Sequence, residues 1–190
     1  TSASQIEGMP YGVTSQISTT QAPTSSFFGA SVLKPGYTEI LMEYSEVLFL
    51  LSEANGWSQS YYEQGVRASM EKWNIDSAKI NAFVAALPPA NKQNVLTQKY
   101  VSLFMQPFEA WAEYRRTGYP NTLLLPGQSA ALNVATASGQ TTYTFTSLIA
   151  DLTDLPTRIY YPTTVQTLNT DNYKAASTAI GGDKMNTKLI

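Results

Sequence analysis

Residues 43–54 have the sequence EYSEVLFLLSEA, and they predict a helix that is buried on more than one side. Residues 47–51 are apolar without interruption, so almost every face of the helix is apolar there, as is typical of a core helix. The helical periodicity extends upstream to Thr38, a suitable N-cap residue. Gly56 is expected to end the helix. This helix is therefore the expected centre of the fold.

A second helix is expected to begin at Ser60, because Ser60 and Glu63 have the spacing of a capping box. Its apolar stripe consists of Tyr62, Val66, Met70 and Trp73. The connection to the first helix is short, so the two should pack antiparallel as an αα-hairpin. This unit is similar to a tetratricopeptide-type hairpin, although the full repeat consensus is not met.

Three further helices are expected, at about residues 77–87, 92–105 and 107–117. The last of them begins with Pro107, a favoured first-turn residue, and should end at Gly118 in a left-handed conformation. Trp111 and Tyr114 are expected on its buried side. The helical region is thus predicted to cover residues 38–118.

The two ends of the chain look different from this helical region. Residues 1–37 are punctuated by Gly and Pro and filled with Ser and Thr, so they predict an irregular segment. Residues 119–190 predict a loop-rich region with a β-like alternation at 142–146 and a short helix at 169–179. We therefore expect one all-α domain over residues 1–190, with tetratricopeptide-like helical hairpins and long irregular, loop-rich ends.

Composition excludes several classes of function. The 190 residues have a formal net charge of −2, so no basic excess favours nucleic-acid binding. The chain contains no Cys and no His, which removes Ser-His-Asp and Cys-His catalysis and the usual zinc sites. No stretch has the roughly 20 apolar residues that a membrane-spanning helix needs. The sequence therefore predicts neither an enzyme nor a cofactor-binding protein.

Carboxylates are the remaining candidates for chemistry, and structural roles explain them better. Glu109 and Glu113 share a helix face, where pairing with nearby arginines is favoured over acid-base catalysis. Glu46 and Glu53 lie on the apolar helix, and at least one is expected to be buried and paired with an arginine. Arg115 and Arg116 are the favoured partners. Two further carboxylates, at positions 151 and 154, favour a turn over a metal site.

Aromatic residues in loops are the candidate ligand contacts. Most aromatic side chains occupy helix-periodic positions and are expected in the core. Tyr11, Phe27, Phe28 and Trp57 lie outside this pattern, among small polar residues, and are the predicted ligand-binding residues. The alternative is that the rings pin the N-terminal segment to the core, and for Phe27 and Phe28 both readings stay open.

Five stretches in order along the chain are similar to the SusD/RagB family. They lie at residues 43–54, 61–70, 97–104, 109–120 and 155–162. The first resembles the family's YAEV-(apolar)-LLAEA helix, with Ser45 and Ser52 where Ala is usual. The fourth, EAWAEYRRTGYP, is the most specific. Together they resemble the C-terminal part of a SusD-like outer-membrane lipoprotein.

The resemblance implies a function at the bacterial cell surface. Members of the family are surface-exposed lipoproteins of the outer membrane that bind glycans, or in some cases peptides. They deliver the ligand to a SusC-type TonB-dependent transporter and have no catalytic activity. The family's lipid anchor and N-terminal helices are expected to lie outside these residues. The alternative function is a structural or protein-interaction helical domain with no nutrient ligand.

Overall fold

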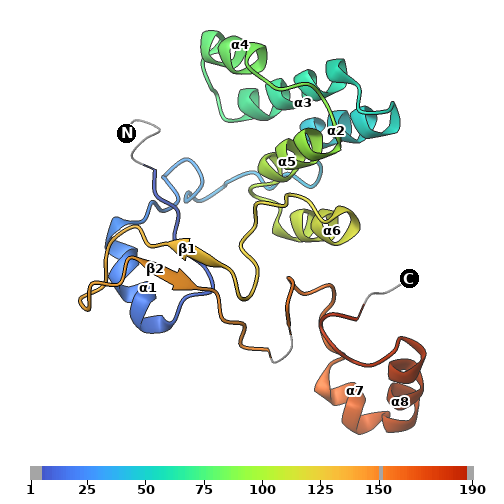
Figure 1. The fold of residues 1–190 in the computed structure, drawn as a ribbon. Coiled ribbons are helices and arrows are strands. Elements are labelled where there is room, and N and C mark those ends of the chain that lie inside the picture. The colour runs from blue at the N-terminus through green and yellow to red at the C-terminus, as the bar shows by residue number, and fades with distance from the viewer. Residues whose placement is uncertain (1–5, 150–151, 188–190) are drawn as a thin grey trace. The chain divides into compact units, whose positions relative to one another are not determined.

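The computed structural model describes residues 6–149 and 152–187. The chain divides into two compact units (Figure 1). Residues 36–123 form a helical unit, and the chain on either side of them, Thr1–Pro35 and Leu124–Ile190, forms the other. Among the described residues, no helix is long and apolar enough to cross a membrane.

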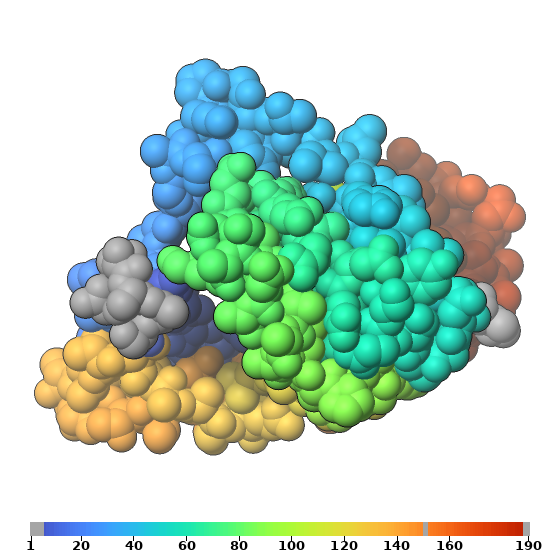
Figure 2. Space-filling model, turned by 90° about the horizontal axis from the view of Figure 1, so that it is seen from above, coloured from blue at the N-terminus to red at the C-terminus, as the bar shows by residue number. Residues whose placement is uncertain are grey.

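The helical unit is a set of antiparallel hairpins, as expected from the sequence. Its helices are α2 (Tyr44–Ala54), α3 (Gln59–Lys72), α4 (Ser77–Ala85), α5 (Lys92–Ser102) and α6 (Pro107–Thr117). The helix α2 packs against both α3 and α5, which makes it the centre of the unit. Side chains of α3 and α4 cover much of the face of this unit seen in Figure 2. The predicted helical class of the fold is confirmed.

The core of the helical unit forms where the first two helices meet. Phe49, Tyr62, Val66 and Val95 are almost completely buried and contact one another. Gly65 allows this packing, because a Cβ atom there would lie 2.8 Å from the Phe49 ring. Burial of each large apolar side chain contributes about 1.5–3 kcal/mol to folding, so this cluster is the main stabilising feature of the unit.

Two predicted helix starts were wrong. The helix α2 begins at Tyr44 rather than after Thr38, and Glu43 precedes it in an extended conformation. Glu43 forms an ion pair with Lys72 there, while Leu41 is 89% exposed, so a longer helix would bury no additional core. The helix α3 begins at Gln59, with Ser58 as its N-cap residue.

The expected end of α6 is confirmed. Gly118 has φ 74° and ψ 13°, in the left-handed region, and its N–H donates to the Tyr114 carbonyl at 2.7 Å. The buried side of α6 differs from expectation: Ala110 and Glu113 are buried, whereas Trp111 and Tyr114 are only half-buried. The reason is that a carboxylate, rather than an aromatic ring, faces α5.

The other unit contains helices that the sequence did not predict. The segment expected to be irregular holds α1 (Ser15–Gln21) and a 3-10 turn, η2 (Ala22–Thr24). Thr14 caps α1, because its Oγ1 accepts a hydrogen bond from the Ile17 N–H at 3.4 Å. Two short antiparallel strands, β1 (Ser129–Ala131) and β2 (Thr142–Thr144), confirm the β-like alternation. The low apolar periodicity of α1 explains why it was missed.

The C-terminal segment is folded around one buried ion pair. The helices α7 (Thr163–Leu168) and α8 (Thr170–Ala179) follow each other directly, and α8 matches the predicted short helix. Arg158 donates to Asp183 at 2.6 Å, and both side chains are buried. Asp183 also accepts a hydrogen bond from the Tyr173 hydroxyl at 3.2 Å. This carboxylate therefore connects the segment before α7 with α8.

Candidate functional site

The N-terminal segment is bound to the β-hairpin by reciprocal hydrogen bonds. Gln21, at the end of α1, is fully buried. Its Nε2 donates to the Val134 carbonyl at 2.8 Å, and its Oε1 accepts from the Val134 N–H at 3.1 Å. Asn133 donates to the Gly8 carbonyl at 2.8 Å. These bonds join residues more than a hundred positions apart and fix α1 against the hairpin.

Aromatic side chains complete the same attachment. The Tyr143 hydroxyl donates to the Tyr11 carbonyl at 2.9 Å, and the Tyr11 hydroxyl donates to the Leu124 carbonyl at 2.9 Å. The Tyr11 ring meets the Phe145 ring edge-on, with 5.7 Å between centroids. Gly12 has φ 74°, and a Cβ atom there would lie 2.2 Å from Phe145. Only glycine therefore allows the chain to pass this ring.

A cavity of about 390 Å³ with an uncharged lining lies between α1 and the turn that connects the two strands. It is lined by Thr14, Gln16, Ile17, Thr20, Thr136, Ala137, Ser138 and Gln140. None of these side chains is charged, and most present a hydroxyl or an amide. The cavity offers neutral donors and acceptors, which is the chemistry that recognises an uncharged, hydroxyl-bearing ligand.

The four predicted ligand residues are divided between the two units. Tyr11 is 46% exposed, Phe27 73% and Phe28 52%, so all three rings reach solvent. None of them lines the cavity. Trp57 is different, because it belongs to the helical unit, is half-buried and packs against its core. Ligand contact at these positions remains a prediction.

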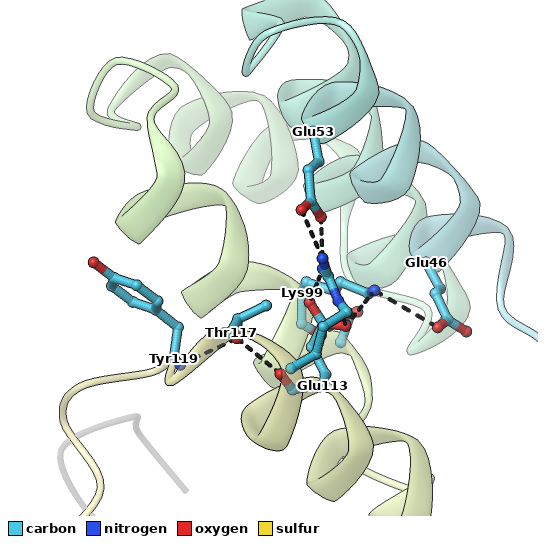
Figure 3. A network of polar contacts seen from close by, with 8 residues as sticks. Glu46, Glu53, Lys99, Glu113, Thr117 and Tyr119 are labelled. Atoms are coloured by element: carbon cyan, nitrogen blue, oxygen red, sulfur yellow. Dashed lines mark hydrogen bonds and ion pairs between the residues drawn. The ribbon is translucent and has the colours of Figure 1, made fainter. Parts of the chain in front are cut away.

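A charged network lies inside the helical unit (Figure 3). Lys99 on α5 is 2% exposed, and its Nζ lies 2.9 Å from Glu113 on α6 and 3.9 Å from Glu46 on α2. Removal of the Glu46 carboxylate from water raises its pKa above the ordinary value, and nearby carboxylates add to this effect while Lys99 opposes it. The buried lysine thus holds three helices together.

Arg116 extends the network to the surface. Its Nη1 and Nη2 donate to the two Glu53 carboxylate oxygens at 2.7 and 2.6 Å, and Nη2 also donates to Glu113 at 2.7 Å. The hydrogen bonds from Arg116 lower the pKa of Glu53. The expected arginine pairing is therefore confirmed at Glu53, which is half-buried. Glu46 is buried but faces a lysine, so neither of the two carboxylates is both buried and paired with an arginine, as was predicted for at least one of them.

The network is structural in character. Glu109 is exposed, whereas Glu113 is buried and bonded to both Lys99 and Arg116, so the two do not face each other as an acid-base pair. Thr117 adds a further bond, donating to the Glu113 carbonyl at 2.8 Å. Every charge in the network is engaged by an opposite one. Such an arrangement connects helices but leaves no free group for a ligand.

No cluster of three or more His, Cys, Asp or Glu side chains suited to a metal is formed by the described residues. Asp151, considered above as a possible oxygen ligand with Asp154, lies outside the described residues.

Sequence patterns did not predict the cavity. Its lining comes from residues 14–20 and 136–140, which are far apart in the chain. The available signal was compositional, since both stretches are rich in Ser, Thr and Gln. Composition alone does not show that two such stretches meet.

Comparisons with known proteins give consistent results. Residues 1–144 match the SusD-like family described as "Starch-binding associating with outer membrane". A solved SusD-like structure of Bacteroidetes AC2a matches with a TM-score of 0.62 and 30% sequence identity over 79% of this chain. The chain spans only 30% of that relative's length. None of the curated proteins compared with the chain matches it.

Proposed function

The chain belongs to the SusD-like family, and from this premise we propose that it is part of a non-enzymatic, nutrient-binding protein of the bacterial outer membrane. The proposed ligand is a glycan, with a peptide as the alternative. The observation that supports it best is that every residue lining the neutral cavity falls within the region that matches the family.

The chemistry of the cavity fits a sugar better than an ion. The Thr20 hydroxyl and the Gln140 amide donate hydrogen bonds within the chain, and the Ser138 hydroxyl bonds to that of Thr136. Their oxygens can still accept hydrogen bonds from sugar hydroxyls. A charged ligand would enter without a counter-charge among the lining residues, at a desolvation cost. The exposed rings of Tyr11, Phe27 and Phe28 do not line the cavity, and they offer separate stacking surfaces for a sugar.

The proposed partner is a SusC-type TonB-dependent transporter, to which the protein delivers its ligand. The proposed location is the cell surface, where a lipid anchor outside these residues attaches the protein to the outer membrane. The family description, which includes association with the outer membrane, supports both proposals. The rival function, a protein-interaction domain without a nutrient ligand, predicts no saturable binding of glycans or peptides.

Adjacent threonines on α1 provide a matched test of the cavity. Thr20 lines the cavity, whereas Thr19 is exposed outside it. Calorimetric titration with starch oligosaccharides and with neutral peptides identifies the ligand class. Thr20→Val should then weaken binding by about five- to tenfold, the usual contribution of one hydrogen bond. Thr19→Val, which removes the same hydroxyl one residue away, should not. Equal affinity in both variants assigns the ligand to another site.

The exposed rings are tested separately. Phe27→Ala and Phe28→Ala remove largely exposed side chains, so the unfolding temperature should change little while ligand affinity falls. A lower unfolding temperature with unchanged binding in the folded fraction would instead assign the rings to packing.

A further inference from the structure

The lining of the cavity between α1 and the turn at 136–140 restricts the kind of sugar that fits it. The cavity measures about 390 Å³, near the lower end of the range for ligand pockets, and therefore suits one or two sugar rings. None of the described residues that line it carries an aromatic ring. The flat face of a plain glucose unit thus finds no stacking partner inside the cavity, so selectivity has to come from the substituents of the sugar.

Both walls of the cavity are fixed before a ligand enters. On one wall, Thr14 caps the helix α1. On the other wall, the turn closes on itself, because the Thr136 N–H donates to the Gln140 carbonyl at 2.9 Å and the Gly139 N–H donates to the Thr136 carbonyl at 2.8 Å. The lining is therefore preorganised, and little affinity is lost in ordering it.

The polar groups of the lining favour a ligand that donates hydrogen bonds. The Thr20 hydroxyl already donates to a backbone carbonyl of α1 at 3.3 Å. The hydroxyls of Thr136 and Ser138 bond to each other at 3.0 Å, which uses one of their two protons, and the Gln140 amide donates one hydrogen to the backbone at 2.6 Å. The oxygens of these groups keep lone pairs, so the bonds within the chain shift the lining towards acceptors. An amide N–H, which donates and never accepts, matches such a lining better than a hydroxyl does.

Side-chain amides lie on both walls of the cavity. Gln16 belongs to α1 and Gln140 to the turn, and each has an Nε2 donor and an Oε1 acceptor. In a trans secondary amide, the N–H and the carbonyl point in opposite directions. A ligand amide can therefore donate to one wall and accept a hydrogen bond from the other.

Each wall also has an apolar side chain. Ile17 on α1 is half-buried, and Ala137 lies in the turn. Burial of one methyl group against such side chains increases affinity about fourfold. A hydroxyl in the same place would lose its hydrogen bonds to water without replacing them. The lining therefore favours a ligand that carries a methyl group beside its amide.

We propose that the cavity recognises the acetamido group of an N-acetylhexosamine within a glycan. This proposal names the substrate class of the proposed glycan-binding function and rests on that function. The acetamido N–H donates to the Gln140 Oε1, the carbonyl accepts from the Gln16 Nε2, and the methyl group packs against Ile17 and Ala137. A glucose unit of starch has a hydroxyl in place of this group, so it offers neither the methyl nor the N–H.

Two disaccharides with the same linkage provide a matched test. N,N′-Diacetylchitobiose and cellobiose differ only at C2 of each ring, where the first has an acetamido group and the second a hydroxyl. Calorimetric titration of the full-length protein should show that diacetylchitobiose binds about tenfold or more tightly than cellobiose. The reason is that an acetamido group adds both a buried methyl and a hydrogen bond.

Two alanines of the turn region locate this preference. Ala137 lines the cavity, whereas Ala135 lies outside the lining, and both are exposed, so either replacement should leave the unfolding temperature unchanged. Ala137→Asp puts a carboxylate where the acetyl methyl is expected and should reduce the preference for diacetylchitobiose about threefold or more. Ala135→Asp adds the same charge nearby and should not alter the preference.

The other outcomes overturn the proposal in distinguishable ways. Equal affinity for the two disaccharides, with both weakened by Ala137→Asp, refutes the acetamido preference but leaves glycan binding in the cavity intact. A preference that Ala137→Asp and Ala135→Asp leave equally strong places the acetamido site elsewhere. Binding of neutral peptides but of neither disaccharide assigns the cavity to the other ligand class. If starch oligosaccharides and neutral peptides also fail to bind, the proposed function itself is wrong.

Discussion

Two glycines of the helical unit are required for different physical reasons. Gly65 is required by packing, because its missing side chain makes room for the Phe49 ring. Gly118 has open space around its Cβ position, so its requirement is conformational, set by φ 74° at the end of α6. Only the role of Gly118 can be predicted from the sequence, because a glycine directly after the last helical residue is a common helix end.

Gly118→Val should lower the free energy of unfolding by about 1 kcal/mol or more, because a β-branched residue is costly in the left-handed region. Urea unfolding followed by tryptophan fluorescence measures this. Gly8→Val is the matched control, since its Cβ position is also open and its φ is not positive. If both variants unfold at the same urea concentration as the parent chain, the conformational argument is wrong.

Glu46 and Glu53, two turns apart on α2, should give opposite pH dependence. Burial raises the pKa of Glu46 above its unfolded value, so its contribution to stability is complete below about pH 4.5 and is lost as pH rises through the folded pKa. Hydrogen bonds from Arg116 lower the pKa of Glu53, so its contribution is present above about pH 4.5 and is lost as pH falls through the folded pKa.

Single Gln substitutions separate the two effects. As pH rises from 4 towards 8, Glu46→Gln should become more stable relative to the parent chain, whereas Glu53→Gln should become less stable relative to it. Unfolding free energies at a series of pH values test this directly. The same direction of change in both variants would refute the assignment of burial to one carboxylate and arginine pairing to the other.

At the scale of elements, α6 is connected to α2 and to α5 by two different kinds of ion pair. The Glu53–Arg116 pair is bidentate, but the side chains are 26% and 47% exposed. The Glu113–Lys99 pair is buried, with side chains 7% and 3% exposed. Solvent screens the first pair and hardly reaches the second. We therefore expect the Glu113–Lys99 pair to contribute more to the free energy of unfolding than the Glu53–Arg116 pair does.

Glu113→Gln should cost about 3–5 kcal/mol, because it leaves the buried Lys99 with only the more distant Glu46 carboxylate. Glu53→Gln should cost about 1 kcal/mol or less, as exposed pairs do. All three tryptophans lie in the helical unit, so fluorescence-detected urea unfolding reports on it specifically. Comparable losses in the two variants would contradict the distinction between screened and buried pairs.

Local sequence predicted most of the helices but not those that are held by contacts with distant residues. Apolar periodicity predicted α2 to α6, each of which buries at least one residue of its apolar side. The helix α8 was also predicted, although none of its residues is buried. The periodicity placed the start of α2 too early, since Leu41 and Met42 continue the apolar pattern but remain exposed. It missed α1, whose Ser- and Thr-rich sequence has little apolar pattern and which is held by a buried Gln21. Side-chain bonds to a distant segment leave no local signal.

At the scale of the whole molecule, the cavity depends on the same long-range contacts. It exists only because Gln21 and Asn133 fix the N-terminal segment against the hairpin, and the turn at 136–140 then closes it. The sequence therefore predicted the fold class and the family but not the location of the cavity. Exposed aromatic residues were predictable as candidates, because loop aromatics among polar residues are visible in the sequence.

The expectation of a single domain over residues 1–190 remains a prediction that unfolding can test. A single domain unfolds in one cooperative transition, whichever part is observed. Tyr143 is buried at the hairpin and Tyr62 is buried in the helical core, so each reports on one of the two compact units. After labelling with 3-fluorotyrosine, ¹⁹F spectra follow both residues in the same sample during thermal unfolding.

The two resonances should shift to their unfolded positions at the same temperature. The Gly118→Val substitution provides the decisive comparison, because it perturbs only the end of α6, in the helical unit. In a single domain, it lowers the midpoint for Tyr143 as much as for Tyr62, since neither unit retains its structure when the other unfolds. If Tyr143 keeps its folded signal while Tyr62 has unfolded, the two units are independent domains. The hairpin, with its cavity, would then fold without the helical unit that interrupts its sequence.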